Sequence, residues 1–156
     1  GRIILKMNAL QDPAMIDRLY EASEHGVQID LIVRGICCLI PGQSYSRNIR
    51  VTRIVDTFLE HARIWYFGNG GNPKLFLGSP DWMRRNLYRR IEAVTPILDP
   101  DAKQELIDML SIQLSDKRKA CFVDENLRNC WKSAHPQKEK VRSQYTFYEY
   151  LKEKTE

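Results

Sequence analysis

The first third of the chain alternates apolar runs with a helical pattern. Residues 3–7 and 27–33 are apolar runs of the length of buried strands. Between them, Asp12 followed by Pro13 is a typical helix start, and Gly26 is a typical helix end. A strand, a helix and a strand in this order predict a βαβ unit. The near-continuous apolar strands predict a parallel sheet that is covered on both faces.

The middle of the chain predicts a helix followed by a pair of strands. Apolar residues spaced three and four apart predict a helix over residues 51–59, after a loop over residues 37–48. A strand is expected to begin near His61 and to continue to a strong turn signal at residues 69–73. Residues 74–77 are then expected to return as its partner strand.

The final part of the chain repeats these signals. Residues 78–81 combine small and capping residues, which predicts a helix start whose backbone N–H groups face a phosphate. Residues 90–97 are expected to form a strand because polar and apolar positions alternate. The remaining expected elements are a helix from Asp99 to about Ser115, a strand at 117–124, an irregular connection at 126–140 and a terminal helix at 141–151 whose aromatic stripe is core or interface. Together these elements predict one mixed α/β domain over residues 1–156.

The composition is that of an ordinary globular protein. The chain is 43% hydrophobic and 28% charged, which suggests neither disorder nor a coiled coil. No apolar stretch approaches ~18 residues, so no signal peptide or transmembrane segment is expected. The four cysteines match neither a zinc ribbon nor a redox motif and are expected to be reduced thiols in the cytosol. Because the chain begins at Gly1, inside an expected strand, we expect a piece of a longer protein.

Positive charge is concentrated in the centre of the sequence. The formal net charge is +4, but residues 47–90 hold nine Lys or Arg and three acids, which is a local charge of +6. A concentrated positive field suits a phosphate or polyanion partner. A solvated basic face is the alternative interpretation.

Three residues are candidates for the chemistry. Arg34 leaves the carboxyl end of an expected strand, where open α/β sheets bind ligands, although an arginine capping a surface loop fits the same position. His61 and Arg63 alternate along an expected strand and therefore share a face, where an imidazole exchanges protons near neutral pH. Arg90 shares a face with Glu92, which is placed to orient it. If Arg34, His61 and Arg90 converge, they neutralise a transferring phosphoryl group and shield or protonate its leaving oxygen.

Five stretches of the sequence resemble the bacterial polyphosphate kinase family that works through a phosphohistidine. They are residues 6–8, 29–39, 58–63, 69–71 and 81–86, and the resemblance extends over nearly the whole chain. It implies the C-terminal of two catalytic domains, each similar to the phospholipase D fold. The implied fold class is α/β, with a mixed sheet flanked by helices and a C-terminal helix.

A shorter pattern resembles the signature of the phospholipase D superfamily. His61-x-Arg63 followed by Gly78-Ser79-x-Asp81 is similar to a degenerate form of its His-x-Lys and Gly-Ser-x-Asn motif. Arginine replaces lysine, aspartate replaces asparagine, and a glycine stands where an acid is expected. These departures argue against independent phosphodiesterase activity.

The family resemblance also implies roles for the three candidates. By this resemblance, Arg34 contacts ATP and its phosphates, His61 is a second active-site histidine that acts as a general acid, and Arg90 lies near the nucleotide. The implied reaction is the reversible transfer of the terminal phosphate of ATP to polyphosphate. Because the histidine that becomes phosphorylated belongs to the preceding domain, we expect this fragment to be inactive by itself.

Ligands, partners and location follow from the same resemblance. The implied ligands are ATP or ADP and inorganic polyphosphate, with Mg²⁺ arriving with the nucleotide and held mainly by groups outside this chain. No metal site is expected within the chain, because the sequence shows no carboxylate cluster for two metals. The implied protein partners are the preceding catalytic domain and further copies in a homo-oligomer. The implied location is the cytoplasm, with peripheral attachment to the inner membrane as the alternative.

Two other functions remain open. The basic segment also suits a nucleic-acid-binding module, but Trp65, Tyr66 and Phe67 lie in a run that looks buried rather than exposed for base stacking, so no nucleic acid is expected. A stand-alone phosphodiesterase is the second alternative. Competition between polyphosphate and single-stranded DNA for binding distinguishes the nucleic-acid module from the phosphate site. Hydrolysis of a chromogenic phosphodiester tests for the stand-alone phosphodiesterase.

Overall fold

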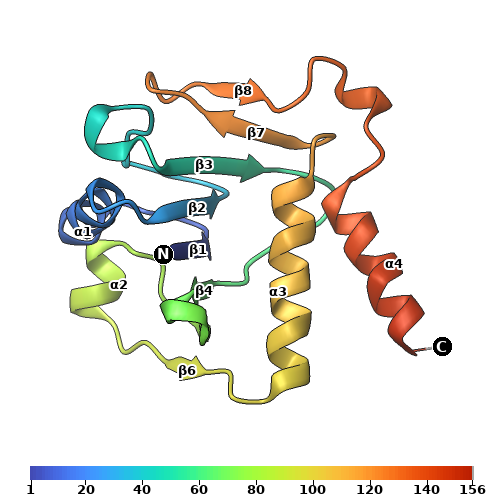
Figure 1. Cartoon of the computed structure of the whole chain (residues 1–156), viewed down its shortest axis with the longest axis horizontal. Coiled ribbons are helices and arrows are strands. Elements are labelled where there is room, and N and C mark those ends of the chain that lie inside the picture. The colour runs from blue at the N-terminus through green and yellow to red at the C-terminus, as the bar shows by residue number, and fades with distance from the viewer. Residues whose placement is uncertain (156) are drawn as a thin grey trace.

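The computed structural model describes residues 1–155, and its centre is one mixed sheet (Figure 1). Eight strands lie in the order β6-β5-β4-β1-β2-β3-β7-β8. Their bounds are β1 (Arg2–Met7), β2 (Gln28–Val33), β3 (Ile49–Ile54), β4 (Ile64–Phe67), β5 (Lys74–Gly78), β6 (Val94–Pro96), β7 (Ala120–Val123) and β8 (Asn129–Trp131). Strands β1, β2 and β3 are parallel neighbours, and the outer strands pair antiparallel.

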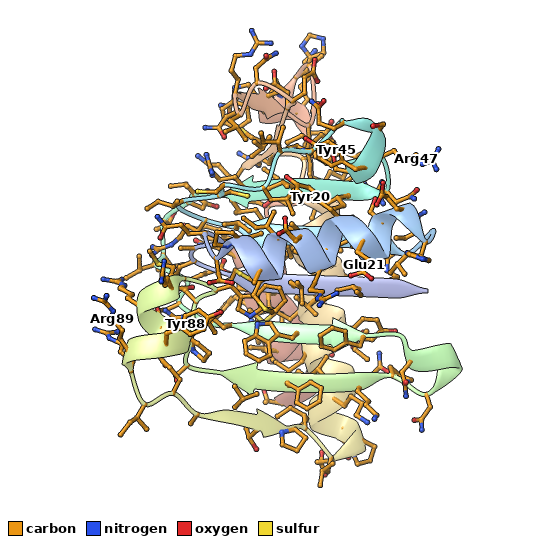
Figure 2. All side chains as sticks on the ribbon, turned by 90° about the vertical axis from the view of Figure 1, so that its left-hand side faces the viewer. Tyr20, Glu21, Tyr45, Arg47, Tyr88 and Arg89 are labelled. Atoms are coloured by element: carbon orange, nitrogen blue, oxygen red, sulfur yellow. The ribbon has the colours of Figure 1, made fainter. Side chains whose placement is uncertain are left out.

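Helices lie on both faces of this sheet. They are α1 (Pro13–Glu24), α2 (Arg84–Arg89), α3 (Pro100–Ser115) and α4 (Ser143–Thr155), with short 3₁₀ turns at Ser44–Ser46, Asn69–Gly71 and Pro136–Lys138. Figure 2 shows α1 in front of the sheet and α3 behind it. None of the helices within residues 1–155 has the length and apolar character needed to cross a membrane.

The predicted βαβ unit is confirmed. The Asp12 side chain accepts a hydrogen bond from the backbone N–H of Met15 at 3.1 Å, and Pro13 occupies the first turn, as a capped helix start requires. Gly26 follows the helix with φ +82°, a conformation that favours glycine. The helix therefore ends where its sequence signals end, and β1 and β2 pair in parallel beneath it.

The core has two halves because successive strand residues face opposite sides of the sheet. In β1, Leu5 packs into the half that contains Ile16 and Leu19 of α1. Its neighbour Ile4 packs into the other half with Leu110 of α3. The side chains of both halves are buried, which agrees with the expectation of a sheet covered on both faces.

The predicted helix over residues 51–59 is wrong. These residues begin inside β3, which pairs with β2 and β7, and an extended loop then leads to β4. A central strand is buried on both faces, so its apolar residues follow no strict alternation and can imitate helical spacing. Ile49, Val51, Thr52 and Ile54 are also β-branched, which favours a strand.

Other element boundaries differ from the expectations by a few residues. The strand expected from His61 begins at Ile64, and the one expected over 117–124 is β7. The connection over 126–140 is not wholly irregular, because it contains β8 and a 3₁₀ turn. The strand expected over 90–97 is reduced to the three residues of β6.

Helix α4 is held by polar contacts at its start rather than by an aromatic core. Asp56, whose side chain is fully buried, accepts two hydrogen bonds from Arg142, from Nε at 2.8 Å and from Nη2 at 2.6 Å. Asp116 accepts the backbone N–H of Ser143 at 2.8 Å. The expected aromatic stripe is not core in the described chain, since Tyr148 is 62% exposed. Its assignment to an interface stays a prediction.

Candidate active site

A cleft of about 600 Å³ opens where β1 and β2 end. All three candidate residues, Arg34, His61 and Arg90, line this cleft. Its other charged lining residues are Arg63, Arg85, Asp81 and Glu92. Four arginines and a histidine thus face two carboxylates, so the lining favours an anionic ligand.

Three chain segments meet here because they continue beside one another after their strands end. Leu10 forms isolated parallel β-bridges with both Cys37 and Trp82. The backbone N–H of Leu10 donates to the carbonyl oxygen of Ile36 at 2.9 Å, and that of Trp82 donates to the carbonyl oxygen of Ala9 at 3.1 Å. The segments after β1, β2 and β5 therefore form one rim, and side chains distant in sequence converge on it.

Arg34 stands at the carboxyl end of β2, as predicted. The last residues of β1 and β2, Met7 and Val33, are paired, so the next residues, Asn8 and Arg34, are neighbours. The Nε of Arg34 donates to Oδ1 of Asn8 at 3.0 Å. Its two terminal nitrogens have no acceptor within residues 1–155 and are available to phosphate oxygens.

His61 and Arg63 lie together, although not in a strand. They occupy the segment before β4, where Nη1 of Arg63 lies 3.2 Å from Nδ1 of His61 and Nη2 lies 3.1 Å from Nε2. Both terminal guanidinium nitrogens thus meet both ring nitrogens, so the two planar groups face one another. The two side chains lie on the same side of the chain as expected, but the expected strand position is wrong, since β4 begins at Ile64.

Asp81 fixes Arg63 and the end of β1 at once. Its Oδ2 lies 3.0 Å from Nη2 of Arg63, and both side chains are nearly buried, at 8% and 12% exposed. Its Oδ1 accepts the backbone N–H groups of Asn8 at 2.8 Å and Ala9 at 3.1 Å. Burial raises the pKa of Asp81, but the hydrogen bonds from Arg63, Ala9 and Asn8 outweigh it, and the pKa is lowered overall.

The segment 78–81 is not a helix start, contrary to the prediction. Helix α2 begins at Arg84, and its N-cap, Met83, makes no side-chain cap. Asp81 does not cap a helix because its carboxylate is used by Arg63 and by the segment after β1. The helix start that lines the cleft is therefore that of α2, through its N-cap Met83, and not residues 78–81.

Glu92 does not orient Arg90 by a hydrogen bond. It accepts instead from the hydroxyl of Ser79 and from Nδ2 of Asn86 at 2.7 Å. These hydrogen bonds lower the pKa of Glu92, and the positive charge of Arg90 contributes at longer range. The guanidinium of Arg90 therefore remains exposed at the cleft, with no carboxylate of residues 1–155 in ion-pair contact.

The cleft does not offer a ready magnesium site. Its two carboxylates are both engaged, Asp81 by Arg63 and backbone groups, and Glu92 by Ser79 and Asn86. Within residues 1–155 no group of three or more His, Cys, Asp or Glu side chains is placed to hold a metal ion. The residues present therefore do not fit a metal site of their own.

A buried ion pair supports the segment that carries His61. Lys6 of β1 donates to Glu60, the residue before His61, at 2.6 Å, and their side chains are 8% and 20% exposed. Gln113 of α3 and Gln144 of α4 also donate to this carboxylate. Burial lowers the pKa of Lys6, and Glu60 opposes that shift. Two helices and the central strand thus hold the backbone beside the imidazole.

We expect Glu60→Gln to lower the free energy of unfolding by about 3 kcal/mol, because it leaves the buried Lys6 ammonium unpaired. The double variant Lys6→Met with Glu60→Gln removes both charges and is expected to recover at least half of that loss. Urea unfolding of the two variants measures both values. Equal stability of the single variant and the native chain would show that the pair does not support this segment.

Comparison with known proteins assigns the family. The sequence profile of polyphosphate kinase C-terminal domain 2 matches residues 1–144. A polyphosphate kinase from Synechocystis is 58% identical over 121 residues, which is 77% of this chain and 17% of that protein. The chain belongs to the polyphosphate kinase family. It spans about a fifth of the length of such curated relatives.

Solved structures agree with the family assignment and show which other proteins have a similar fold. The crystal structure of polyphosphate kinase from Porphyromonas gingivalis matches with a TM-score of 0.95 and 56% identity, over 99% of this chain and 24% of that chain. Nuc from Salmonella typhimurium, a phospholipase D family member, matches with a TM-score of 0.56 at 15% identity, over 73% of this chain and 78% of that one. The predicted phospholipase D-like fold is confirmed, and at this identity the second likeness concerns the fold alone.

The cleft contains further residues that sequence analysis did not single out as candidates. Asn8 orients Arg34, Asn86 holds Glu92, and Arg85 adds a cation to the cleft. The stretches 6–8 and 81–86 had carried the family resemblance, which was the available signal. The buried pair of Lys6 and Glu60 had no local signal, because its partners are 54 residues apart.

Proposed function

We propose that this chain forms one wall of the ATP and polyphosphate site of a polyphosphate kinase. The observation that carries the proposal is the convergence of Arg34, His61 and Arg90 on one cleft. The reaction would be the reversible transfer of the terminal phosphate of ATP to polyphosphate, through a phosphohistidine in a preceding catalytic domain. Residues 1–156 would form one domain of that longer enzyme.

In this proposal each residue has a distinct task. The free terminal nitrogens of Arg34 and the exposed guanidinium of Arg90 bind phosphate oxygens and neutralise charge as the phosphoryl group transfers. His61 donates a proton to the oxygen of the departing diphosphate and recovers it in the reverse direction. Arg63, held by Asp81, keeps the imidazole in place. Arg63 and Asp81 are therefore positioning residues.

Ligands and partners belong to the same proposal. ATP or ADP and polyphosphate would be the substrates, and Mg²⁺ would enter with the nucleotide. The preceding domain would complete the cleft, and the full-length enzyme would be a homo-oligomer. We place it in the cytoplasm, with peripheral attachment to the inner membrane as the alternative.

Two observations favour this function over the alternatives. The aromatic residues of β4 do not form a stacking platform, since Trp65 packs against Trp82 at 5.8 Å between ring centroids and Phe67 against Phe76 at 6.2 Å. Arg63, at the lysine position of the phospholipase D signature, is occupied by the ion pair with Asp81. Neither arrangement suits a nucleic-acid platform or an independent phosphodiesterase.

The test compares the full-length enzyme with residues 1–156 alone. We expect ATP-dependent polyphosphate synthesis by the full-length enzyme, no synthesis by the isolated chain, and no hydrolysis of a chromogenic phosphodiester by either. Phosphodiester hydrolysis by the isolated chain would support the stand-alone phosphodiesterase instead. A full-length protein that binds single-stranded DNA but makes no polyphosphate would support the nucleic-acid module.

A further inference from the structure

The arginine-lined surface does not end at the cleft but continues along α2. Arg85 belongs both to the cleft and to a second hollow of about 390 Å³, which it shares with Arg84 and Arg89. Arg84 and Arg89 in turn belong to a third hollow of about 450 Å³, beside Tyr88 and the start of α1. Because each hollow shares at least one arginine with the next, the three are adjacent and form one continuous surface. Figure 2 shows Tyr88 and Arg89 on the outer side of α2.

These arginines are not engaged by the rest of the fold. Arg84, Arg85 and Arg89 are exposed, and none is in ion-pair contact with a carboxylate among residues 1–155. Asp12 lines the third hollow, but it is buried and accepts the backbone N–H of Met15. The positive charge of this surface is therefore available to a ligand.

The helix dipole does not explain the placement of Arg84 and Arg85. Arg84 and Arg85 occupy the first turn of α2, which contains no acid, and cations are unfavourable at the positive end of a helix dipole. Arg85 and Arg89 are four residues apart, so their like charges repel along one helix face. Arg89 lies in the last turn, where a cation is favourable, so the cost comes from Arg84 and Arg85 and from the repulsion between Arg85 and Arg89 unless an anion offsets it.

The spacing and chemistry suit a chain of phosphates. A guanidinium pairs two phosphate oxygens at once, and successive guanidinium groups can hold successive phosphates. The terminal phosphates of a nucleotide are already provided for by the cleft, so a row beyond it needs a longer anion. We propose that Arg84, Arg85 and Arg89 form a track that holds the polyphosphate chain beyond the transfer site. This proposal rests on the proposed function.

The test replaces all three arginines of the track by glutamine in the full-length enzyme. Glutamine has a helix propensity close to that of arginine, so α2 is expected to remain folded. We expect the KM for long-chain polyphosphate to rise about 10-fold or more, from the summed loss of three charge contacts, and its salt dependence to become shallower. A second variant replaces only Arg84 and Arg89, which do not line the cleft, and in it the KM for ATP and the kcat are expected to stay within about twofold.

Arg47→Gln is the matched control. It removes one exposed arginine at the opposite end of the strands from Arg89, as Figure 2 shows, and is expected to leave the KM for polyphosphate unchanged. A variant with lysine at all three track positions keeps the charge and is expected to give an intermediate KM. Because lysine keeps the charge but lacks the planar guanidinium, this variant shows how much of the effect depends on the guanidinium geometry.

The outcomes divide clearly. If the native enzyme makes polyphosphate but the triple glutamine variant matches Arg47→Gln, the track is wrong and the proposed function stands. In the variant at Arg84 and Arg89 alone, an equal rise in the KM for ATP and for polyphosphate would place these arginines in the nucleotide site and overturn the track. Inhibition by single-stranded DNA that the triple variant abolishes, without a change in the KM for polyphosphate, would assign the row to nucleic acid. A native enzyme without polyphosphate synthesis overturns the proposed function itself.

Discussion

Replacing His61 by alanine is expected to lower the rate of polyphosphate synthesis by the full-length enzyme by roughly 100- to 10,000-fold, the usual contribution of a general acid. The imidazole lies in the arginine-lined cleft against Arg63, where a proton can reach a leaving phosphate oxygen. Because His61 is exposed, its loss should not unfold the domain. Initial rates with saturating ATP measure the effect.

Two further variants separate proton transfer from other roles. His61→Asn retains a side chain that can accept from Arg63 but cannot carry the proton, and it is expected to be as slow as the alanine variant. His135→Ala removes another exposed histidine, which precedes the 3₁₀ turn Pro136–Lys138 and does not line the cleft, and is expected to leave the rate unchanged. Normal turnover by His61→Ala would show that the histidine is structural.

Replacing Asp81 by alanine is expected to lower the free energy of unfolding by about 3–5 kcal/mol. The change leaves the nearly buried Arg63 unpaired and removes the acceptor of two backbone N–H groups, those of Asn8 and Ala9. Asp81→Asn keeps an oxygen that accepts the two backbone N–H groups, and it is expected to lower the free energy of unfolding by less than Asp81→Ala does. Urea unfolding of both variants, with the exposed Asp17→Ala as the control, measures the difference.

The pH dependence gives a second test of Asp81. The pKa of Asp81 is lowered in the folded chain. Its contribution to the free energy of unfolding is therefore fully present above the pKa of the unfolded state, about 3.9, and is lost as the pH falls through the pKa of the folded state. The stability difference between the native chain and Asp81→Ala should therefore be constant near neutral pH and shrink below about pH 4. A difference that grows with acidity would contradict the assigned ion pair.

The sequence predicted the elements whose signals are local. Asp12 with Pro13 and Asp99 with Pro100 each marked a helix start, and in both cases the aspartate caps the helix as expected. The strand β3 was missed because its identity depends on pairing with β2 and β7, which no local pattern reveals. A doubly buried strand and an amphipathic helix can share the same apolar spacing.

The site was predictable in its residues but not in its connections. Arg34, His61 and Arg90 could be singled out from strand ends, charge and family resemblance, and they line one cleft. The hydrogen bonds of Asp81 to the segment after β1 span more than 70 positions of sequence. Such contacts follow from the order of the strands in the sheet, which places β5 and β1 on either side of β4.

The most direct test of the account is a crystal structure of the full-length enzyme with a non-hydrolysable ATP analogue. The account predicts that phosphate oxygens lie within hydrogen-bond distance of the guanidinium groups of Arg34 and Arg90, with the imidazole of His61 beside the oxygen that bridges the terminal phosphate. Phosphates bound away from all three side chains, with the cleft empty, would contradict the assignment of this cleft as the transfer site.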